Sequence, residues 1–81
     1  MKMPRDESGL SLAKRLKILG YETTRQTGSH IRITTAQNGE HHVTIPAHNP
    51  LKVGTINSIL SEVAGHFNIT KNELLIRLWK V

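Results

Sequence analysis

Hydrophobic residues recur at helical spacing in two stretches that bracket the middle of the chain. The first stretch, residues 8–19, opens on Ser8, a good N-cap, and stops before Gly20, a typical left-handed helix terminator. The second opens at Thr55 and is expected to end at Gly65, and its i, i+3, i+4, i+7 pattern has no mismatch. Both stretches therefore predict amphipathic helices. Their apolar stripes consist of Leu12, Ala13, Leu16 and Leu19, then Ile56, Ile59, Leu60 and Val63.

A third helix is predicted for residues 70–81. Thr70 followed three residues later by Glu73 has the form of a capping box. Its apolar positions leave two interpretations open: the helix packs on the core of this chain, or it forms a surface that binds a partner. Those positions are Leu74, Leu75, Leu78, Trp79 and Val81.

Between the first two helices the period changes from helical to alternating. Residues 21–27 are rich in Thr, residues 30–35 alternate apolar and polar, and residues 41–45 alternate again. Asn38-Gly39 between the last two is a strong hairpin signal. The resulting order is α-β-β-β-α with an additional C-terminal helix, a two-layer α+β fold whose helices cover one sheet face. Strand alternation places His30 and Arg32 on the opposite, open face.

Composition narrows the class of protein. The chain has 81 residues, no cysteine and a formal net charge of +5. We expect one domain over residues 1–81, with residues 1–7 as a mobile N-terminal arm and 70–81 as an extra helix. No apolar run reaches the roughly 20 residues that span a bilayer, and the absence of cysteine suits a reducing compartment, so we expect a cytoplasmic protein. The positive charge favours a polyanionic partner such as RNA, DNA or an acidic protein.

Several kinds of catalytic site are disfavoured by the residues present. The chain has five histidines, but His41 and His42 are adjacent in a strand and point to opposite faces, while His48 and His66 lie in unrelated elements. We therefore expect no metal site. No glycine-rich phosphate loop occurs, and with six acidic residues no serine triad suggests itself.

A histidine beside basic residues is sufficient for one reaction, the cleavage of RNA. A neutral imidazole on His30 can accept the proton of the 2′-hydroxyl, help that is worth roughly 10²–10⁴ in rate. Arg32 could hold the phosphate oxygens as a fork, and Arg25, Lys14 and Lys17 could hold neighbouring phosphates. Gly28 is expected to supply a turn conformation that is strained for other residues, and Ser29 to tie its hydroxyl to the turn. No cofactor is required.

Four motifs resemble the HicA toxin family in order and spacing, over about residues 8 to 66. They are Gly20-Tyr21-Glu22, Arg25-Gln26-Thr27-Gly28-Ser29-His30, His41-His42-Val43-Thr44-Ile45-Pro46, and the segment Val53-Gly54-Thr55-Ile56-Asn57-Ser58-Ile59-Leu60. The resemblance implies a double-stranded-RNA-binding-domain-like fold and a ribosome-independent mRNA interferase, with the family's catalytic histidine at His30. It also implies a HicB-type antitoxin that masks this site, and a pair that commonly represses its own operon. The N-terminal arm, the helix after Thr70, and Ile31, where many members have a second histidine, depart from the family.

Two other functions fit the same residues. One is a non-catalytic module that binds double-stranded RNA by shape. The other is an interaction subunit whose last helix docks a partner such as the antitoxin. For the toxin itself, the substrate is mRNA and the free protein is expected to be monomeric. The proton donor for the leaving oxygen is unassigned, with His42 as a candidate if it lies across the hairpin from His30.

Overall fold

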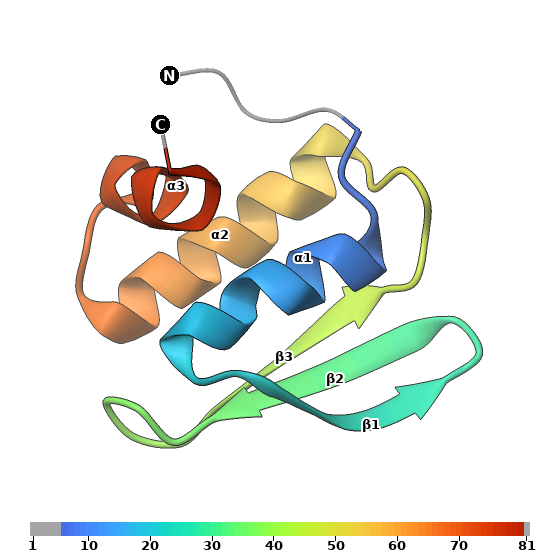
Figure 1. The fold of residues 1–81 in the computed structure, drawn as a ribbon, viewed down its shortest axis with the longest axis horizontal. Helices are drawn as coiled ribbons and strands as arrows, with labels where there is room; N and C mark the ends of the chain where they lie inside the picture. The colour runs from blue at the N-terminus through green and yellow to red at the C-terminus, as the bar shows by residue number, and fades with distance from the viewer. Residues whose placement is uncertain (1–5, 81) are drawn as a thin grey trace.

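One helix, three antiparallel strands and two further helices follow each other along the chain in the computed structural model, which describes residues 6–80 (Figure 1). This is the predicted α+β order, the α-β-β-β-α layout of a double-stranded-RNA-binding-like domain with a C-terminal helix added. The elements are α1 (Gly9–Arg15) with a 3₁₀ extension (Leu16–Leu19), β1 (Glu22–Thr27), β2 (His30–Thr35), β3 (His41–Pro46), α2 (Val53–Phe67) and α3 (Lys71–Trp79).

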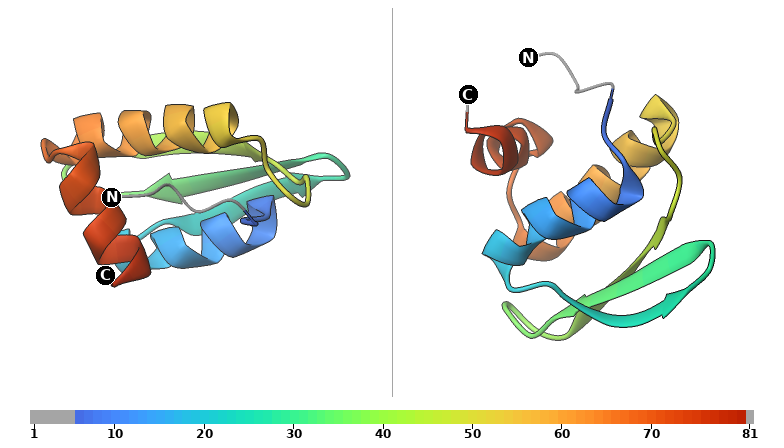
Figure 2. Two further views of the ribbon diagram at one scale, coloured as in Figure 1. Left: turned by 90° about the horizontal axis from the view of Figure 1, so that it is seen from above. Right: turned by 45° about the vertical axis from the view of Figure 1, so that its right-hand side comes forward.

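The sheet has the order β1-β2-β3, and both of its pairings are antiparallel. Helices α1 and α2 lie side by side over one face, and the other face is open (Figures 1 and 2). The helices cover this face because the inward residues of β2 and β3, Ile31, Ile33, Val43 and Ile45, are apolar and become almost fully buried. The predicted Asn38-Gly39 hairpin is confirmed, with φ of 57° and 95° at these two residues.

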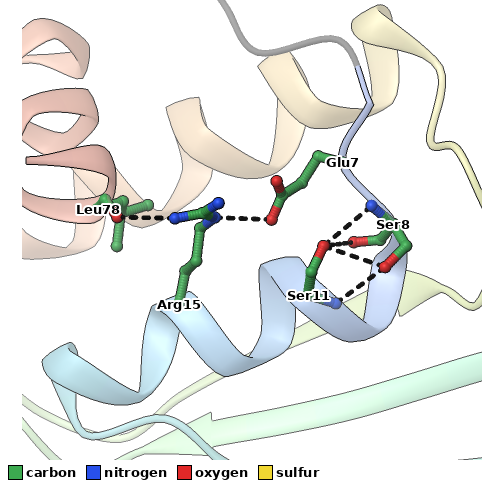
Figure 3. Close-up of polar contacts among 5 residues, drawn as sticks. All are labelled: Glu7, Ser8, Ser11, Arg15 and Leu78. Atoms are coloured by element: carbon green, nitrogen blue, oxygen red, sulfur yellow. Dashed lines mark hydrogen bonds and ion pairs between the residues drawn. The ribbon is translucent and has the colours of Figure 1, made fainter. Parts of the chain in front are cut away.

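Helix α1 begins and ends as its sequence predicts. The Ser8 hydroxyl accepts a hydrogen bond from the amide of Ser11 at 3.0 Å, and the Ser11 hydroxyl lies 3.0 Å from the amide of Ser8 in return (Figure 3). At the other end Gly20 has φ of 84°, in the left-handed region. The apolar stripe of this helix is buried.

The predicted bounds of α2 are wrong at both ends. The helix begins at Val53 with Lys52 as an N-cap that makes no side-chain hydrogen bond, so Thr55 lies inside the first turn. Gly65 stays helical, and the helix ends at Phe67 because Asn68 takes the left-handed conformation with φ of 57°. Asparagine reaches that region more easily than most residues, which lets it replace glycine as a terminator. The predicted apolar stripe is confirmed as buried.

Helix α3 packs on the core of its own chain, which decides between the two interpretations of its apolar positions. Leu74, Leu75 and Leu78 are 6% exposed or less. The predicted capping box is confirmed, since the Thr70 hydroxyl accepts from the amide of Glu73 at 3.0 Å. Figure 2 shows α3 beyond the α1–α2 layer, on the side away from the sheet. Val81, the last of the predicted positions, lies outside the described residues.

Arg15 joins three parts of the helical layer. Its Nε donates to the carboxylate of Glu7 at 2.8 Å, and its Nη1 donates to the carbonyl of Leu78 in α3 at 3.3 Å (Figure 3). Its guanidinium also lies 4.7 Å from the ring centre of Trp79. This side chain therefore bridges the segment before α1 and helix α3.

The predicted mobile arm does not include Glu7. Residues 1–5 lie outside the described residues, but Glu7 is only 5% exposed, and its carbonyl accepts from the amide of Leu51 at 2.7 Å. Burial of its carboxylate is offset by the ion pair with Arg15, which a charge pattern alone does not reveal. Within residues 6–80, no helix is long and apolar enough to cross a membrane.

Candidate functional site

His30 is the first residue of β2, and its side chain is exposed on the open face. The Ser29 hydroxyl lies 3.1 Å from its Nδ1 atom. The carbonyl of Ser29 in turn accepts from the amide of Ala47 at 2.9 Å, which ties the corner to the end of β3. Because Nδ1 is next to Ser29, Nε2 is the ring nitrogen left for an external partner. Strand alternation predicted this face correctly.

Gly28 does not serve the turn in the expected way. Gly20 and Gly39 have a positive φ, whereas Gly28 does not. The corner therefore makes no use of a conformation that only glycine adopts easily. A Cβ atom built at Gly28 would meet no atom within 4 Å. Gly28 therefore leaves open space at this corner.

Arg25 and Arg32 lie directly opposite each other in the β1–β2 pair. The ladder is irregular between Thr23 and Arg25, where one extra residue in β1 shifts the register. Without this bulge, alternation from Thr23, which pairs with the inward-facing Ile33, would place Arg25 on the helix-covered face. The bulge instead brings Arg25 to the face of Arg32 and His30. Sequence alternation could not reveal this, because it assumes a regular strand.

Two like charges in opposite positions repel each other, at a cost of a few tenths of a kcal/mol or more. Both arginines are exposed, and no ion pair to either is formed among the described residues. Their row is two residues along β2 from His30, about 7 Å away. An anion placed between the guanidinium groups would relieve the repulsion. This row is therefore suited to hold a phosphate next to the imidazole.

Lys14 and Lys17 are exposed as predicted, but on the helical side of the sheet. With Leu10, Ala13, Thr23 and Ile31 they line a groove of about 240 Å³ between α1 and the edge strand β1. The structure thus divides the predicted RNA-binding residues in two. Arg25 and Arg32 accompany His30, whereas the lysines lie beyond the edge of β1.

His42 is too far from His30 to be its proton-donating counterpart. It pairs with Thr34, whose hydroxyl lies 2.8 Å from its Nδ1 atom. Thr34 is four residues along β2 from His30, so the positions of the two histidines are about 13 Å apart along the strands. They share a face, but they do not meet across the hairpin.

His41 has a structural role on the covered face. Its Nδ1 lies 2.7 Å from the hydroxyl of the fully buried Tyr21, and its ring stacks on His66 at 4.4 Å. Burial, followed by the proximity of Glu62, raises the pKa of Tyr21 to about 12. Burial also lowers the pKa of His41, helped by the neighbouring His66. Across residues 6–80 no group of three His, Asp or Glu side chains is arranged to hold a metal ion.

Comparison with known families identifies the chain. The sequence model described as the HicA toxin of bacterial toxin–antitoxin matches residues 11–65, which include β1, β2 and β3. The chain belongs to the HicA toxin family. The match contains Gly28, Ser29, His30 and both arginines, while α3 lies outside it. The chain has no significant match among curated proteins or among solved structures.

Proposed function

We propose that this HicA-family chain is a ribosome-independent endoribonuclease that cleaves mRNA without a metal ion, with His30 as the general base. One observation carries the proposal: an exposed imidazole lies next to two opposed arginines on the uncovered sheet face, and neither arginine forms an ion pair within residues 6–80. Imidazole is a suitable base at neutral pH, and the arginine fork matches the geometry of a phosphate. The family match covers all of these residues.

The reaction uses a nucleophile that RNA itself carries. Nε2 of His30 takes the proton of the 2′-hydroxyl, and the oxygen attacks the adjacent phosphorus. Arg25 and Arg32 hold the non-bridging oxygens, where negative charge develops. Ser29 positions the imidazole through Nδ1, and Lys14 and Lys17 contact the RNA where it passes over the edge of β1. DNA lacks the 2′-hydroxyl and is not cleaved.

In this proposal the chain is the toxin of a pair and works in the cytoplasm. Its partner is a HicB-type antitoxin that covers the open face and keeps RNA away from His30. The free toxin is a monomer. Co-expression of a HicB-type antitoxin should then relieve growth arrest, and the purified complex should not cleave RNA.

Purified protein and naked RNA test the reaction directly. The wild type should cleave single-stranded mRNA in the presence of a metal chelator, and should leave a DNA strand of the same sequence intact. His30→Ala should slow cleavage by about 10²–10⁴. His42→Ala is a matched control because it removes an exposed histidine from the same face, far from the site. Cleavage by His30→Ala at the wild-type rate would refute the assignment.

Binding of double-stranded RNA without cleavage is the second candidate function. The observation that supports it is the α-β-β-β-α layout, which is like that of double-stranded-RNA-binding domains. In that case the wild type would bind duplex RNA with a steep salt dependence and release no fragments. His30→Ala would then bind as tightly as the wild type. The cleavage assay separates the two functions.

A further inference from the structure

One backbone hydrogen bond extends the β2–β3 pairing past Pro46, the last residue of β3. His30 is opposite Pro46, and the amide of Ala47 donates to the carbonyl of Ser29 at 2.9 Å. The next residue after Ala47 is His48. In an antiparallel ladder this step brings His48 to the end of the sheet where Gly28 and His30 lie.

When the alternation of β3 is extended by two residues past Pro46, His48 takes the parity of the open face. Val43 and Ile45 are buried on the covered face, and Ala47 packs against the same core. Residues of the other parity face outward, as the exposed His42 and Thr44 show. His48 has this second parity and is itself exposed.

The backbone of His48 is held by the start of α1. Its carbonyl accepts from the amide of Gly9 at 2.9 Å. Gly9 leaves no room for a Cβ atom against the carbonyl of Pro46, so the two segments are in close contact. Glu7, two residues before Gly9, accepts a hydrogen bond at its carbonyl from the amide of Leu51, three residues after His48. A side chain on such an anchored backbone keeps its position better than one on a loop tip.

The spacing that the extended register gives the two histidines suits a phosphodiester. Diagonal neighbours on one face of an antiparallel pair are about 7–8 Å apart, within reach of long side chains, and His48 is diagonal to His30. Gly28, which faces His48 in the extended register, adds no side chain, and the space where its Cβ would lie is empty. The Arg25–Arg32 row lies on the other side of His30.

We infer that His48 is the second catalytic histidine, the general acid that protonates the leaving 5′-oxygen; this rests on the proposed ribonuclease function. His30 accepts the 2′-hydroxyl proton as the bond from the 2′-oxygen to phosphorus forms. The bond from phosphorus to the 5′-oxygen breaks, and protonated His48 delivers its proton to that oxygen. The products are a 2′,3′-cyclic phosphate and a free 5′-hydroxyl. Both histidines return to their starting states by proton exchange with water.

A change of leaving group separates an acid from a residue that only binds. A dinucleotide with an ordinary 5′-oxygen needs the proton, whereas its analogue with a bridging 5′-sulfur does not, because a thiolate leaves without one. His48→Ala should cleave the oxygen substrate about 10²–10⁴ more slowly than the wild type. It should cleave the sulfur substrate within a few-fold of the wild-type rate. His30→Ala should be slow on both.

Two further measurements make the outcome decisive. His42→Ala should match the wild type on both substrates, and thermal unfolding should show that His48→Ala is folded, as expected for an exposed side chain. Equal loss on both substrates, or no loss on either, would overturn the role of His48. If the wild type cleaves neither substrate, the ribonuclease function itself is wrong and this inference goes with it. A wild type that depends on His30 but not on His48 contradicts the inference alone.

Discussion

Two pairs of histidines lie near opposite ends of the sheet, one packed against the protein and the other exposed. His30 and His48 lie at the start of β2 and just after β3, and both are exposed. His41 and His66 lie near the hairpin on the covered side, with their rings stacked at 4.4 Å. The covered pair is engaged by the protein, since His41 contacts the Tyr21 hydroxyl and Nε2 of His66 lies 2.9 Å from the carbonyl of Gln37. In the exposed pair, the Ser29 hydroxyl lies 3.1 Å from Nδ1 of His30.

The comparison shows histidine in two roles: one pair packs within the fold, and the other is available for chemistry. At the covered end, burial raises the pKa of Tyr21 and lowers that of His41, so both groups are held neutral. At the exposed end, Arg25 and Arg32 are paired directly across β1 and β2, and their repulsion lowers the stability of the fold. Neither arginine has an acidic partner within the described chain. An arrangement that weakens the fold but suits an anion is typical of a binding site.

The largest expected contrast comes from removing one histidine at each end. His41→Ala should lower the free energy of unfolding by about 1–3 kcal/mol, because it leaves the buried Tyr21 hydroxyl without its partner. His30→Ala and His48→Ala should each change it by about 0.5 kcal/mol or less. Urea unfolding measures all three, with His42→Ala as the neighbouring control. An unchanged midpoint for His41→Ala would show that the covered cluster does not hold the fold together.

Acid should weaken the covered end specifically. The pKa of His41 is lowered in the folded state by burial, and next by His66, so the unfolded chain binds a proton more readily. The contribution of neutral His41 to the free energy of unfolding is fully present above about pH 6.5. It is lost as the pH falls through the lowered pKa of the folded state, by at most about 1.4 kcal/mol per pH unit.

His41→Gln provides the control for this acid sensitivity, since glutamine can still accept from Tyr21 but does not titrate. Urea unfolding between pH 7.5 and 5.5 should show a flatter pH dependence for this variant than for the wild type. An identical pH dependence in both proteins would assign the acid sensitivity to another group.

The smallest effect on stability is expected when one of the paired arginines is replaced, and this effect is a gain rather than a loss. Arg25→Gln or Arg32→Gln should raise the free energy of unfolding by a few tenths of a kcal/mol, because it removes the repulsion across the strands. The same changes should weaken RNA binding and reduce its salt slope by about 1. Titration of RNA into the His30→Ala background measures this without cleavage. A loss of stability would mean that the pair is not a repulsive one.

Local patterns in the sequence were sufficient for most of the fold. Capping residues located the starts of α1 and α3, alternation located β2 and β3, and the family motifs pointed to His30. The bounds of α2 were missed because Gly65 has the composition of a terminator, while Asn68, three residues on, adopts the terminating conformation. Gly28 was expected to serve the turn, and instead it leaves open space at the corner before β2.

The sequence by itself determined the order of elements, the buried stripe of each helix and the open face on which His30 lies. These follow from the local periods of 3.6 and 2, which need no knowledge of distant residues. Only the tertiary structure decided that a bulge turns Arg25 toward Arg32, that Arg15 binds Glu7 and Leu78, and that His42 lies opposite Thr34, away from His30. Each of these depends on register or on contacts between separate segments, and hydrophobic periodicity does not encode them.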